Sequence, residues 1–247
     1  MNTAFDSAHI LDASKQYMPF LLEVRRRVLF VAAIFFIFSA LGFIYYEKII
    51  RLILRAFELQ GINIVFTSPF QFINLAINSA LMVGAVVVFP LIIWQIILFV
   101  RPALTKAEFK LTLSLLPLSI ILFVAGMTFG VMIMRWVMVL FYEKSVQLNI
   151  GNYLDVSQLL SQVIMTGVLM GVAFQFPVVL TMLLKVRLMT FKALSDKRLL
   201  AYGISLVFAA MLPPIDLLSL VLLTLPLIIL FELTLVLNRY ILRTHVT

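Results

Sequence analysis

Cysteine is absent from this 247-residue sequence, and histidine occurs only as His9 and His245, one in each tail. The lack of thiols excludes disulfides, thiol nucleophiles and thiolate metal sites. Histidines confined to the tails exclude an HExxH metal site inside a membrane. The apolar segments contain neither a serine with a histidine or lysine partner nor two aspartates, which excludes an intramembrane protease. We therefore predict no enzymatic activity and no cofactor, nucleotide or metal site.

Charge is scarce as well, because only 12% of the residues are charged while 64% are apolar, including 22 Phe. A soluble domain has roughly 25% charged residues. So much apolar surface cannot be hidden inside one soluble domain of this length, and most of it must face lipid. The chain is predicted to be an all-α membrane protein.

Six apolar runs are predicted to cross the bilayer as helices, because about 20 residues at 1.5 Å each span a ~30 Å hydrocarbon core. They form one polytopic domain, 1–247, with spans at about 28–46, 72–100, 111–134, 156–184, 199–212 and 217–237. Pro213-Pro214 is interpreted as a turn, since proline lacks a backbone donor and constrains its predecessor. The fifth and sixth helices are therefore short. The fifth reaches only ~21 Å, so a re-entrant hairpin is the alternative.

Lysine and arginine divide unevenly between the two sides of these spans. With the N-terminus inside, the inner segments carry Lys15, Arg25, Arg26, Arg27, Arg101, Lys106, Lys110, Lys185, Arg187, Lys192, Lys197, Arg198, Arg239 and Arg243. The outer segments carry Lys48, Arg51, Arg55, Arg135 and Lys144. This division follows the positive-inside rule and requires an even number of spans. Segment 1–27 and tail 239–247 are therefore predicted to be cytoplasmic, and the net charge of +8 does not indicate nucleic-acid binding.

Two further patterns bear on the class of membrane protein. Between residues 47 and 59, polar side chains recur at three- and four-residue steps, which predicts an amphipathic helix at the outer interface. The halves 1–110 and 111–247 do not match in length, proline placement or polar positions. The inverted repeats common in secondary transporters are therefore not evident. A small-molecule or ion secondary transporter is kept as the alternative function.

Two notable polar side chains inside the predicted spans are the ionisable Glu232 and the amide Gln175, since such groups are costly in lipid and often functional. Glu232 either has a functional role or pairs with Arg239 near the inner interface. Gln175 precedes Pro177, which has no N–H and so frees the carbonyl of Ala173. The Gln175 amide either satisfies such a freed carbonyl or faces a polar cavity that admits a substrate.

Three carboxylates lie near the ends of the predicted spans. Glu23 and Glu108 are each surrounded by basic residues on the predicted cytoplasmic side. The local explanation for Glu23 is an i,i+4 pair with Arg27, worth about 0.3 kcal/mol. A functional role needs a cationic ligand, because carboxylates bind guanidinium groups bidentately and lysine cannot imitate this. Asp216 follows the Pro-Pro turn and is predicted to cap the sixth helix.

Several short motifs follow one another along residues 17 to 240. In chain order they are Phe20-Leu21-Leu22-Glu23-Val24-Arg25-Arg26-Arg27, Ser68-Pro69-Phe70, Pro90, Gln95, Phe99, Pro102-Ala103-Leu104-Thr105-Lys106-Ala107-Glu108, Phe174-Gln175-Phe176-Pro177, Pro213-Pro214-Ile215-Asp216, Pro226, Phe231-Glu232 and Arg239. This order resembles the TatC family, the receptor component of the twin-arginine protein translocase. No single motif is specific, but the ordered set on a six-span map is.

The sequence departs from the family pattern at three positions. Phe20 replaces an early histidine, so any role of that imidazole is absent. Gln175 replaces the glutamate of the fourth span, which keeps hydrogen bonding but removes a titratable charge. Ile215 is inserted before Asp216 at the hairpin tip. The resemblance is therefore to a divergent member.

The resemblance implies a receptor for signal peptides with consecutive arginines, in a translocase that moves folded proteins across an energised membrane. The implied signal-peptide site lies on the cytoplasmic face and contains Glu23, Arg25, Phe99, Lys106 and Glu108. Its basic residues would repel cationic peptides that lack the geometry of paired guanidinium groups. The energy would come from the proton-motive force.

The resemblance also implies partners and a location. TatA-like and TatB-like single-span subunits would lie in the lipid bilayer on the concave face of the second, fourth and sixth spans. Gln175 and Glu232 would be their intramembrane polar contacts, and Ser68, Pro69 and Asp216 would mark the outer hairpin. The implied location is the bacterial cytoplasmic (inner) membrane, with an organellar inner or thylakoid membrane as the alternative.

Overall fold

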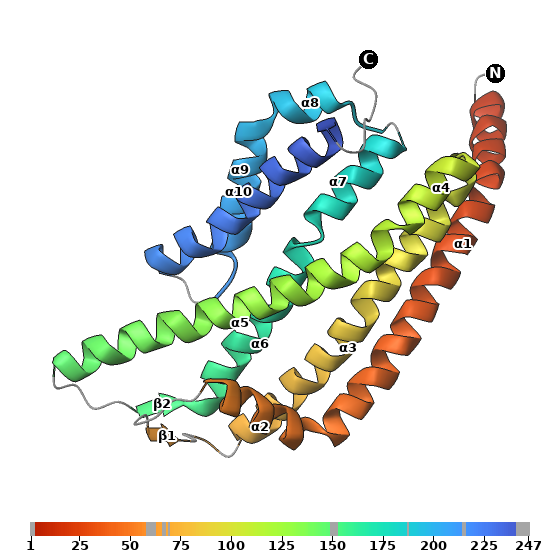
Figure 1. The fold of residues 1–247 in the computed structure, drawn as a ribbon. Coiled ribbons are helices and arrows are strands. Elements are labelled where there is room, and N and C mark those ends of the chain that lie inside the picture. The colour runs from red at the N-terminus through yellow and green to blue at the C-terminus, as the bar shows by residue number, and fades with distance from the viewer. Residues whose placement is uncertain are drawn as a thin grey trace.

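The structure is a computed structural model that describes residues 3–57, 63–65, 68, 70–148, 153–186, 188–213 and 216–240. Helices make up nearly all of this part of the chain (Figure 1). The two strands within it, β1 (Asn63–Val65) and β2 (Tyr153–Asp155), have three residues each and pair in parallel. The prediction of an all-α fold is confirmed.

The helices follow one another as α1 (Thr3–Ile44), α2 (Tyr46–Phe57), α3 (Phe70–Val100), the 3-10 turn η1 (Arg101–Ala103), α4 (Lys106–Leu113), α5 (Leu115–Gln147), α6 (Val156–Ala173), α7 (Phe176–Lys185), α8 (Phe191–Asp196), α9 (Arg198–Ala210) and α10 (Leu217–Tyr240). Five segments of the described chain are long and apolar enough to cross a membrane, namely Leu21–Ile44, Phe70–Val100, Glu108–Gln147, Ser157–Lys185 and Leu217–Tyr240. Helix α9 is apolar but has only 13 residues. The crossing by this fifth predicted span therefore stays a prediction.

Two helices extend well beyond the predicted spans. Helix α1 is continuous from Thr3, although its apolar run was predicted to begin at residue 28. The third span was predicted to end at 134, but α5 continues through Arg135 to Gln147. No glycine or proline occurs between Gly130 and Gly151, so nothing in this stretch breaks the helix. Hydropathy marks where lipid ends, which is not where a helix must end.

The fourth predicted span is broken near its middle. Helix α6 ends at Ala173 and α7 begins at Phe176, with Pro177 in its first turn. Because Pro177 has no N–H, the ladder of hydrogen bonds is interrupted there and resumes with Val179 N–H donating to the Gln175 carbonyl at 3.0 Å. The break positions the Gln175 side chain.

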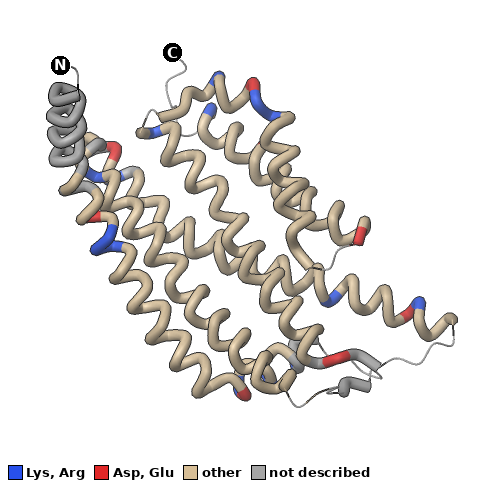
Figure 2. Tube along the Cα trace, turned by 180° about the vertical axis from the view of Figure 1, so that it is seen from behind, with Lys and Arg blue, Asp and Glu red and all other residues tan. Residues whose placement is uncertain are grey.

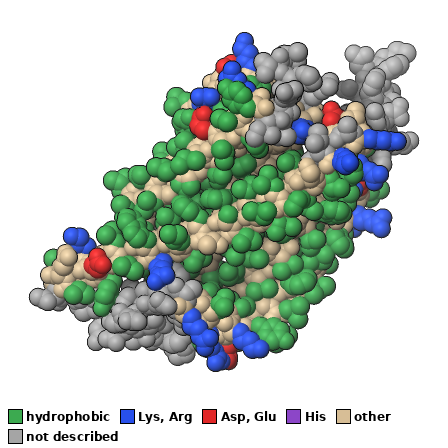
Figure 3. Space-filling view, viewed as in Figure 1, with side chains coloured by type: hydrophobic (Ala, Val, Ile, Leu, Met, Phe, Trp, Pro, Cys, Tyr) green, Lys and Arg blue, Asp and Glu red, His purple; other side chains and the backbone are tan. Residues whose placement is uncertain are grey.

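The bundle has two ends of different character. One end, here called the α4 end, contains η1, α4 and α8, together with the beginning of α1 and the end of α10 (Figure 1). The other, the α2 end, contains α2, β1, β2 and the beginnings of α3 and α6. Lysines and arginines gather mostly at the α4 end (Figure 2). The intervening surface in Figure 3 is covered by hydrophobic side chains, as lipid contact requires.

Glycines allow α5 and α6 to pack closely. Gly126 and Gly130 of α5 face Gly167 and Gly171 of α6, and each pair has the four-residue spacing of a small-residue helix interface. A Cβ on Gly126 would lie 2.6 Å from the Met170 carbonyl oxygen. These backbones therefore approach too closely for any side chain, and the α5–α6 pair is a rigid part of the scaffold.

Small residues also join α1 to α3, where a Cβ on Gly42 would lie 2.8 Å from the Val83 Cβ.

Helix α2 confirms the predicted amphipathic helix. Its Ile53 is buried against Leu75 of α3 and Leu160 of α6, with Ile49 and Ile50 beside it. Its apolar face therefore packs on the bundle and closes the α2 end.

Candidate functional site

Glu23, the first predicted site residue, is held by a hydrogen-bonded chain that joins α1 to α3. Arg27 donates to Glu23 Oε1 from Nε at 3.0 Å and from Nη2 at 2.6 Å. Its Nη1 donates to Gln95 Oε1 at 2.7 Å and to the Gln95 carbonyl at 3.3 Å. The predicted pair of Glu23 with Arg27 is confirmed, and it is tied to a second helix, which an isolated i,i+4 pair is not.

The Glu23 carboxylate is half-exposed, with 47% of its side chain accessible, whereas Arg27 is only 24% accessible. Both bonds from Arg27 go to Oε1, and no described residue donates to Oε2. The chain Gln95–Arg27–Glu23 therefore fixes the carboxylate in place and leaves Oε2 without a donor among the described residues. An oxygen presented in this way can accept a cationic donor from outside.

Glu108 is positioned by the first turn of α4. Thr105 is the N-cap, and its backbone N–H and hydroxyl donate to Glu108 Oε2 at 2.9 and 2.8 Å. The Glu108 N–H donates back to Thr105 Oγ1 at 3.3 Å, which completes a capping box. Glu108 also interacts electrostatically with Lys185 at the end of α7. Its carboxylate is therefore fixed relative to the bundle.

The other predicted members of this site lie on the same elements. Arg25 is exposed on α1, Phe99 is 37% exposed near the end of α3, and Lys106 is exposed as the first residue of α4. Arg27, Gln95 and Phe99 line one end of a 510 Å³ cavity between α1 and α3 whose remaining walls are apolar, formed by Val24, Val28, Val31, Ala32, Phe35, Val88, Ile92 and Ile96. The structure thus places all five predicted residues at the α4 end, and one of them, Phe99, lines the apolar cavity. Gln95 and Arg27 were not predicted as site residues.

Gln175 is buried, and its amide is used within the chain. Ser119 Oγ donates to Gln175 Oε1 at 2.6 Å, and Gln175 Nε2 donates to the Ser119 carbonyl at 2.9 Å. The amide therefore bonds α5 and does not satisfy Ala173. Gln175 also borders a 320 Å³ cavity between α3, α7, α9 and α10, walled by Phe89, Ile92, Phe176, Phe208 and other apolar residues.

Glu232 does not pair with Arg239, so this prediction is wrong. Its Oε1 accepts a hydrogen bond from Tyr202 Oη at 2.6 Å, and its Oε2 lies 3.6 Å from Arg198 Nη2. Both partners are on α9, because the antiparallel packing of α9 and α10 brings the beginning of one beside the end of the other. The Glu232 carboxylate therefore links α10 to α9, the two helices of the predicted hairpin.

The outer-hairpin residues have local roles where the structure describes them. Ser68 Oγ accepts from the Phe70 N–H at 3.4 Å at the start of α3, while Pro69 lies outside the described residues. Asp216 accepts from the Ser219 N–H at 2.8 Å and from its hydroxyl at 2.6 Å. The predicted helix cap at Asp216 is confirmed.

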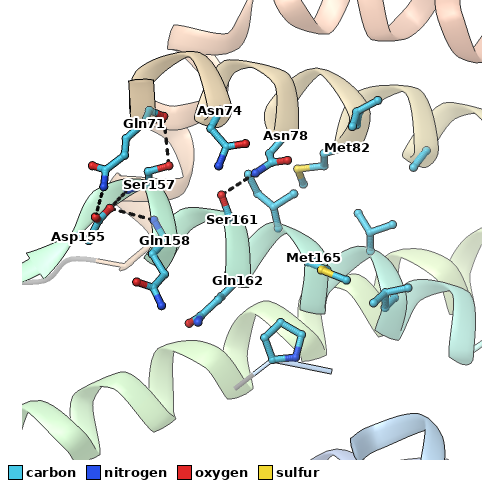
Figure 4. Close-up of a pocket in the computed structure, with 16 residues that line it drawn as sticks. Gln71, Asn74, Asn78, Met82, Asp155, Ser157, Gln158, Ser161, Gln162 and Met165 are labelled. Carbon is cyan, nitrogen blue, oxygen red and sulfur yellow. Dashed lines mark hydrogen bonds between the residues drawn. The ribbon is translucent and has the colours of Figure 1, made fainter. Parts of the chain in front are cut away.

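A group of amide side chains at the α2 end was not predicted. Gln71 Nε2 donates to Asp155 Oδ2, and Asn78 Nδ2 donates to Ser161 Oγ at 2.7 Å, so polar bonds link α3 to α6 (Figure 4). The sequence does contain polar residues at helical spacing in the segments that form α3 and α6. It was missed because the sequence does not reveal that these two faces meet.

Comparisons with known proteins agree with this architecture. A family model described as "Sec-independent protein translocase protein (TatC)" matches residues 19–226. The TatCy protein of Bacillus subtilis is 31% identical over 88% of this chain and 86% of its own length. The TatC protein of Aquifex aeolicus is 30% identical over 89% of this chain and 92% of its own length. A crystal structure titled as the twin arginine translocase receptor TatC superposes with a TM-score of 0.78 at 28% identity, over 88% of this chain and 98% of that one.

Proposed function

Because the chain belongs to the TatC family of Sec-independent protein translocase proteins, we propose that it is the receptor for twin-arginine signal peptides in its membrane. It is a multi-pass membrane subunit of a protein translocase, and it is not an enzyme. As a Tat component it works in a complex with other Tat components and with protein substrates. Membership of this family favours a translocase subunit over a secondary transporter.

The α4 end is proposed to face the cytoplasm, with α9 completing six crossings. This orientation is supported by the excess of lysine and arginine at that end (Figure 2). It is also supported by the placement of the beginning of α1 and the end of α10 at one end of the bundle (Figure 1). We propose the bacterial cytoplasmic membrane as the location.

The proposed contacts are one guanidinium group on Glu23 and the other on Glu108. Glu23 presents Oε2 while Arg27 and Gln95 hold it in place, and Glu108 is fixed by its capping box. A receptor whose carboxylates are already ordered loses little conformational entropy on binding. Arginine is favoured over lysine because its planar group donates two parallel hydrogen bonds to a carboxylate. Arg25 and Lys106 add positive charge that disfavours other cationic peptides.

The cavity between α1 and α3 supports the same proposal. Signal peptides carry an apolar stretch after their positive region. The 510 Å³ cavity begins at Arg27 and Gln95, next to the Glu23 carboxylate, and is otherwise apolar. Exposed ion pairs contribute only ~0–1 kcal/mol each, so burial of apolar residues there would supply much of the affinity. The observation that carries the proposal is this ordered carboxylate beside an apolar cavity.

The partner subunits are proposed to be TatA-like and TatB-like single-span helices on the concave face, at the 320 Å³ cavity that Gln175 borders. Interhelical hydrogen bonds in membranes average well under ~2 kcal/mol. Exchanging a Gln175 bond to Ser119 for one to a partner is therefore inexpensive. The proton-motive force is proposed as the energy source.

The decisive test compares two variants of the α4 turn. Glu108→Gln removes the charge but keeps a side chain that still completes a capping box. Thr105→Ala removes the cap but keeps the charge. We expect Glu108→Gln to weaken binding of a twin-arginine peptide about fivefold, or ~1 kcal/mol. Thr105→Ala keeps the charge and the backbone N–H bond to Glu108 Oε2 but loses the hydroxyl bond, so it should weaken binding only about twofold. Binding is measured by fluorescence anisotropy with the full chain in nanodiscs.

A twin-lysine peptide serves as the ligand control. The unaltered chain should prefer the twin-arginine peptide, and Glu108→Gln should reduce that preference. Equal affinity of the two peptides for the unaltered chain, or undiminished binding by Glu108→Gln, contradicts the proposed receptor function.

A further inference from the structure

The α2 end contains a cavity of 630 Å³ between the first halves of α3 and α6, with Pro213 of the α9–α10 connection at its side. Figure 4 shows polar side chains from both helices around it. From α3 come Gln71, Asn74 and Asn78, and from α6 come Gln158, Ser161 and Gln162. Steps of three and four residues on α3, and from Gln158 to Ser161 and Gln162 on α6, place each set along one face of its helix. The cavity is therefore lined by two rows of uncharged polar side chains.

Some of these side chains hold the two helices together, and others have no partner. Asn78 is bonded to Ser161, and Gln71 to Asp155. The side-chain amides of Asn74, Gln158 and Gln162 accept or donate no hydrogen bond among the described residues, although all three border the cavity. An amide carries both donors and an acceptor. The cavity thus offers unused donors and acceptors in about equal measure.

The polar row on α3 extends to the edge of the hydrocarbon. Helix α3 has 31 residues, about 46 Å, so if centred it projects roughly 8 Å beyond a ~30 Å core at each end. Asn78 is eight residues into α3, roughly 12 Å from its first residue and a few Å inside the core. Below it the cavity is walled by apolar residues such as Met82, Ile164 and Met165. Asn78 is bonded to Ser161 at this depth, whereas the unbonded amides of Asn74 and Gln158 lie nearer the helix beginnings, where water or a polar occupant can bond them.

The charge of the lining restricts the occupant. Among the described residues that border the cavity, Asp155 alone is charged, and its carboxylate caps α6 by accepting from the Ser157 and Gln158 N–H groups. A phospholipid headgroup carries a phosphate, which needs lysine or arginine, and the lining has neither. A membrane helix bonds its own backbone and would use only a small part of these amides. An extended polypeptide has unpaired N–H and C=O groups along its whole length, and it matches both rows.

We propose that this cavity binds an extended, uncharged polypeptide segment of the precursor, downstream of its arginine pair. The proposal rests on the proposed function, because it supplies a second subsite to the same receptor. Backbone groups of the segment bond Asn74, Gln158 and Gln162, and its small apolar side chains face Met82 and Met165. The strand β2 already brings extended backbone to the rim at Asp155.

The distance between the two subsites fits one chain. Phe99 and Asn78 are 21 residues apart on α3, or about 32 Å at 1.5 Å per residue. A precursor covers this distance with about 21 helical residues, or with about 10 extended ones. The apolar stretch of a signal peptide can therefore link an arginine pair at the α4 end to a segment in the amide cavity.

The absence of cysteine from the sequence makes the test direct. Single variants Asn74→Cys, Gln158→Cys and Gln162→Cys are placed in membrane vesicles with the complete translocase, and precursors carry one cysteine at successive positions after the arginine pair. We expect disulfides from all three sites to precursor positions about 10 to 21 residues after the arginines. Ile73→Cys and Ile77→Cys, exposed on α3 and outside the cavity, are the controls and should give at least tenfold less.

A second variant tests whether the amides matter. Gln158→Leu with Gln162→Leu keeps the size of the side chains and removes their hydrogen bonds. We expect export of a twin-arginine precursor to fall at least tenfold while peptide binding at the α4 end stays within twofold. Export at the unaltered rate overturns the proposal.

The controls separate this proposal from the receptor function. Phe99→Cys reports the α4 end. Crosslinks there without crosslinks in the cavity overturn the subsite and leave the receptor function standing. No precursor crosslink at either end overturns both. Crosslinks from the cavity to cysteines in a single-span partner subunit, in place of the precursor, also overturn the subsite.

Discussion

The two ends of the bundle are built from different kinds of polar group. At the α4 end, the carboxylates of Glu23 and Glu108 stand beside cations, and each is ordered by bonds within the chain. At the α2 end, the cavity is lined by amides and hydroxyls, and the one carboxylate, Asp155, caps a helix. Under the two proposals, the first arrangement would select a ligand by charge and geometry, and the second would select one by hydrogen bonds to uncharged groups.

This difference follows from where each group sits. A charge is costly in hydrocarbon, so Glu23 and Glu108 lie beyond the apolar core of their helices. An amide is less costly, so Asn78 can lie deeper, bonded to Ser161, and Gln162 can border the cavity without a partner among the described residues. A bundle with both ends can recognise the charged beginning of a peptide and accept an uncharged segment that follows it. The predictions below test whether the ends are independent.

The scaffold common to both ends gives the largest expected effect. Gly126→Leu places a side chain where a Cβ alone would lie 2.6 Å from the Met170 carbonyl oxygen. Because backbone cannot move aside as a side chain can, we expect a loss of about 3 kcal/mol or more in the free energy of unfolding. Thermal unfolding in detergent measures it, and both peptide binding and cavity crosslinking should fall together.

Gly203→Leu is the matched control. Nothing lies within 4 Å of a Cβ on Gly203, and α9 is exposed there. This variant should unfold within about 0.5 kcal/mol of the unaltered chain, as an exposed substitution does. Equal destabilisation by the two variants would show that close packing of α5 on α6 is not what holds the scaffold.

A smaller effect, confined to the α4 end, is expected from Gln95→Leu. It removes the side-chain acceptor of Arg27 Nη1 and leaves only the 3.3 Å bond to the backbone carbonyl. Loss of a bond to a charged group costs about 1.5 kcal/mol, and the position of Glu23 becomes less defined. The affinity of the chain for a twin-arginine peptide should fall about fivefold. The ratio of its affinities for the twin-arginine and twin-lysine peptides should also decrease.

Gln95→Glu retains an acceptor for Arg27 and should restore the preference. Crosslinking from the amide cavity to a bound precursor should be unchanged per molecule bound. A Gln95→Leu chain that keeps its full preference for arginine would mean that the link to α3 does not position Glu23.

Most of the fold was predictable from the sequence, because apolar runs long enough to cross a bilayer have few alternative structures. Helix ends were less predictable. The α5 helix passes Arg135, since one charge does not end a helix where the residues from 131 to 147 include no glycine or proline. The break at Gln175 was indicated by Pro177, but its partner Ser119 is 56 residues away on another helix. Nothing local in the sequence identifies that contact.

The candidate sites divide in the same way. Glu23 and Glu108 were predicted as site residues because charge near an apolar run is conspicuous, and their binding role stays a prediction. The Glu23–Arg27 pair was predictable because it is local. The partner of Glu232 was predicted wrongly because Arg239 is near in sequence, whereas Arg198 is near only after α9 packs on α10. The amide cavity was missed altogether because it exists only where α3 meets α6. Contacts between helices require the packing, which one sequence does not supply.

A lesser effect is expected at the α2 end from Thr166→Val. Thr166 is fully buried, and its hydroxyl donates to the carbonyl of Pro213 at the side of the amide cavity. Its loss should cost about 1 kcal/mol and reduce crosslinking from Gln162→Cys, without changing peptide affinity at the α4 end. Thr128→Val is the control, because that exposed hydroxyl bonds only the Val124 carbonyl in its own helix. Identical behaviour of the two variants would remove Thr166 from any role in shaping the cavity.

Salt should give the smallest effect and the clearest contrast between the ends. Raising NaCl from about 0.05 to 0.5 M shortens the screening length from roughly 14 to 4 Å. Glu23 is half-exposed, so twin-arginine affinity should fall about threefold, or ~0.65 kcal/mol. Crosslinking from Asn74→Cys in a preformed complex should not change, because its bonds involve no net charge. If salt weakens both contacts by the same factor, the ends are not chemically distinct. If it weakens neither, the carboxylates do not bind the arginines through exposed ion pairs.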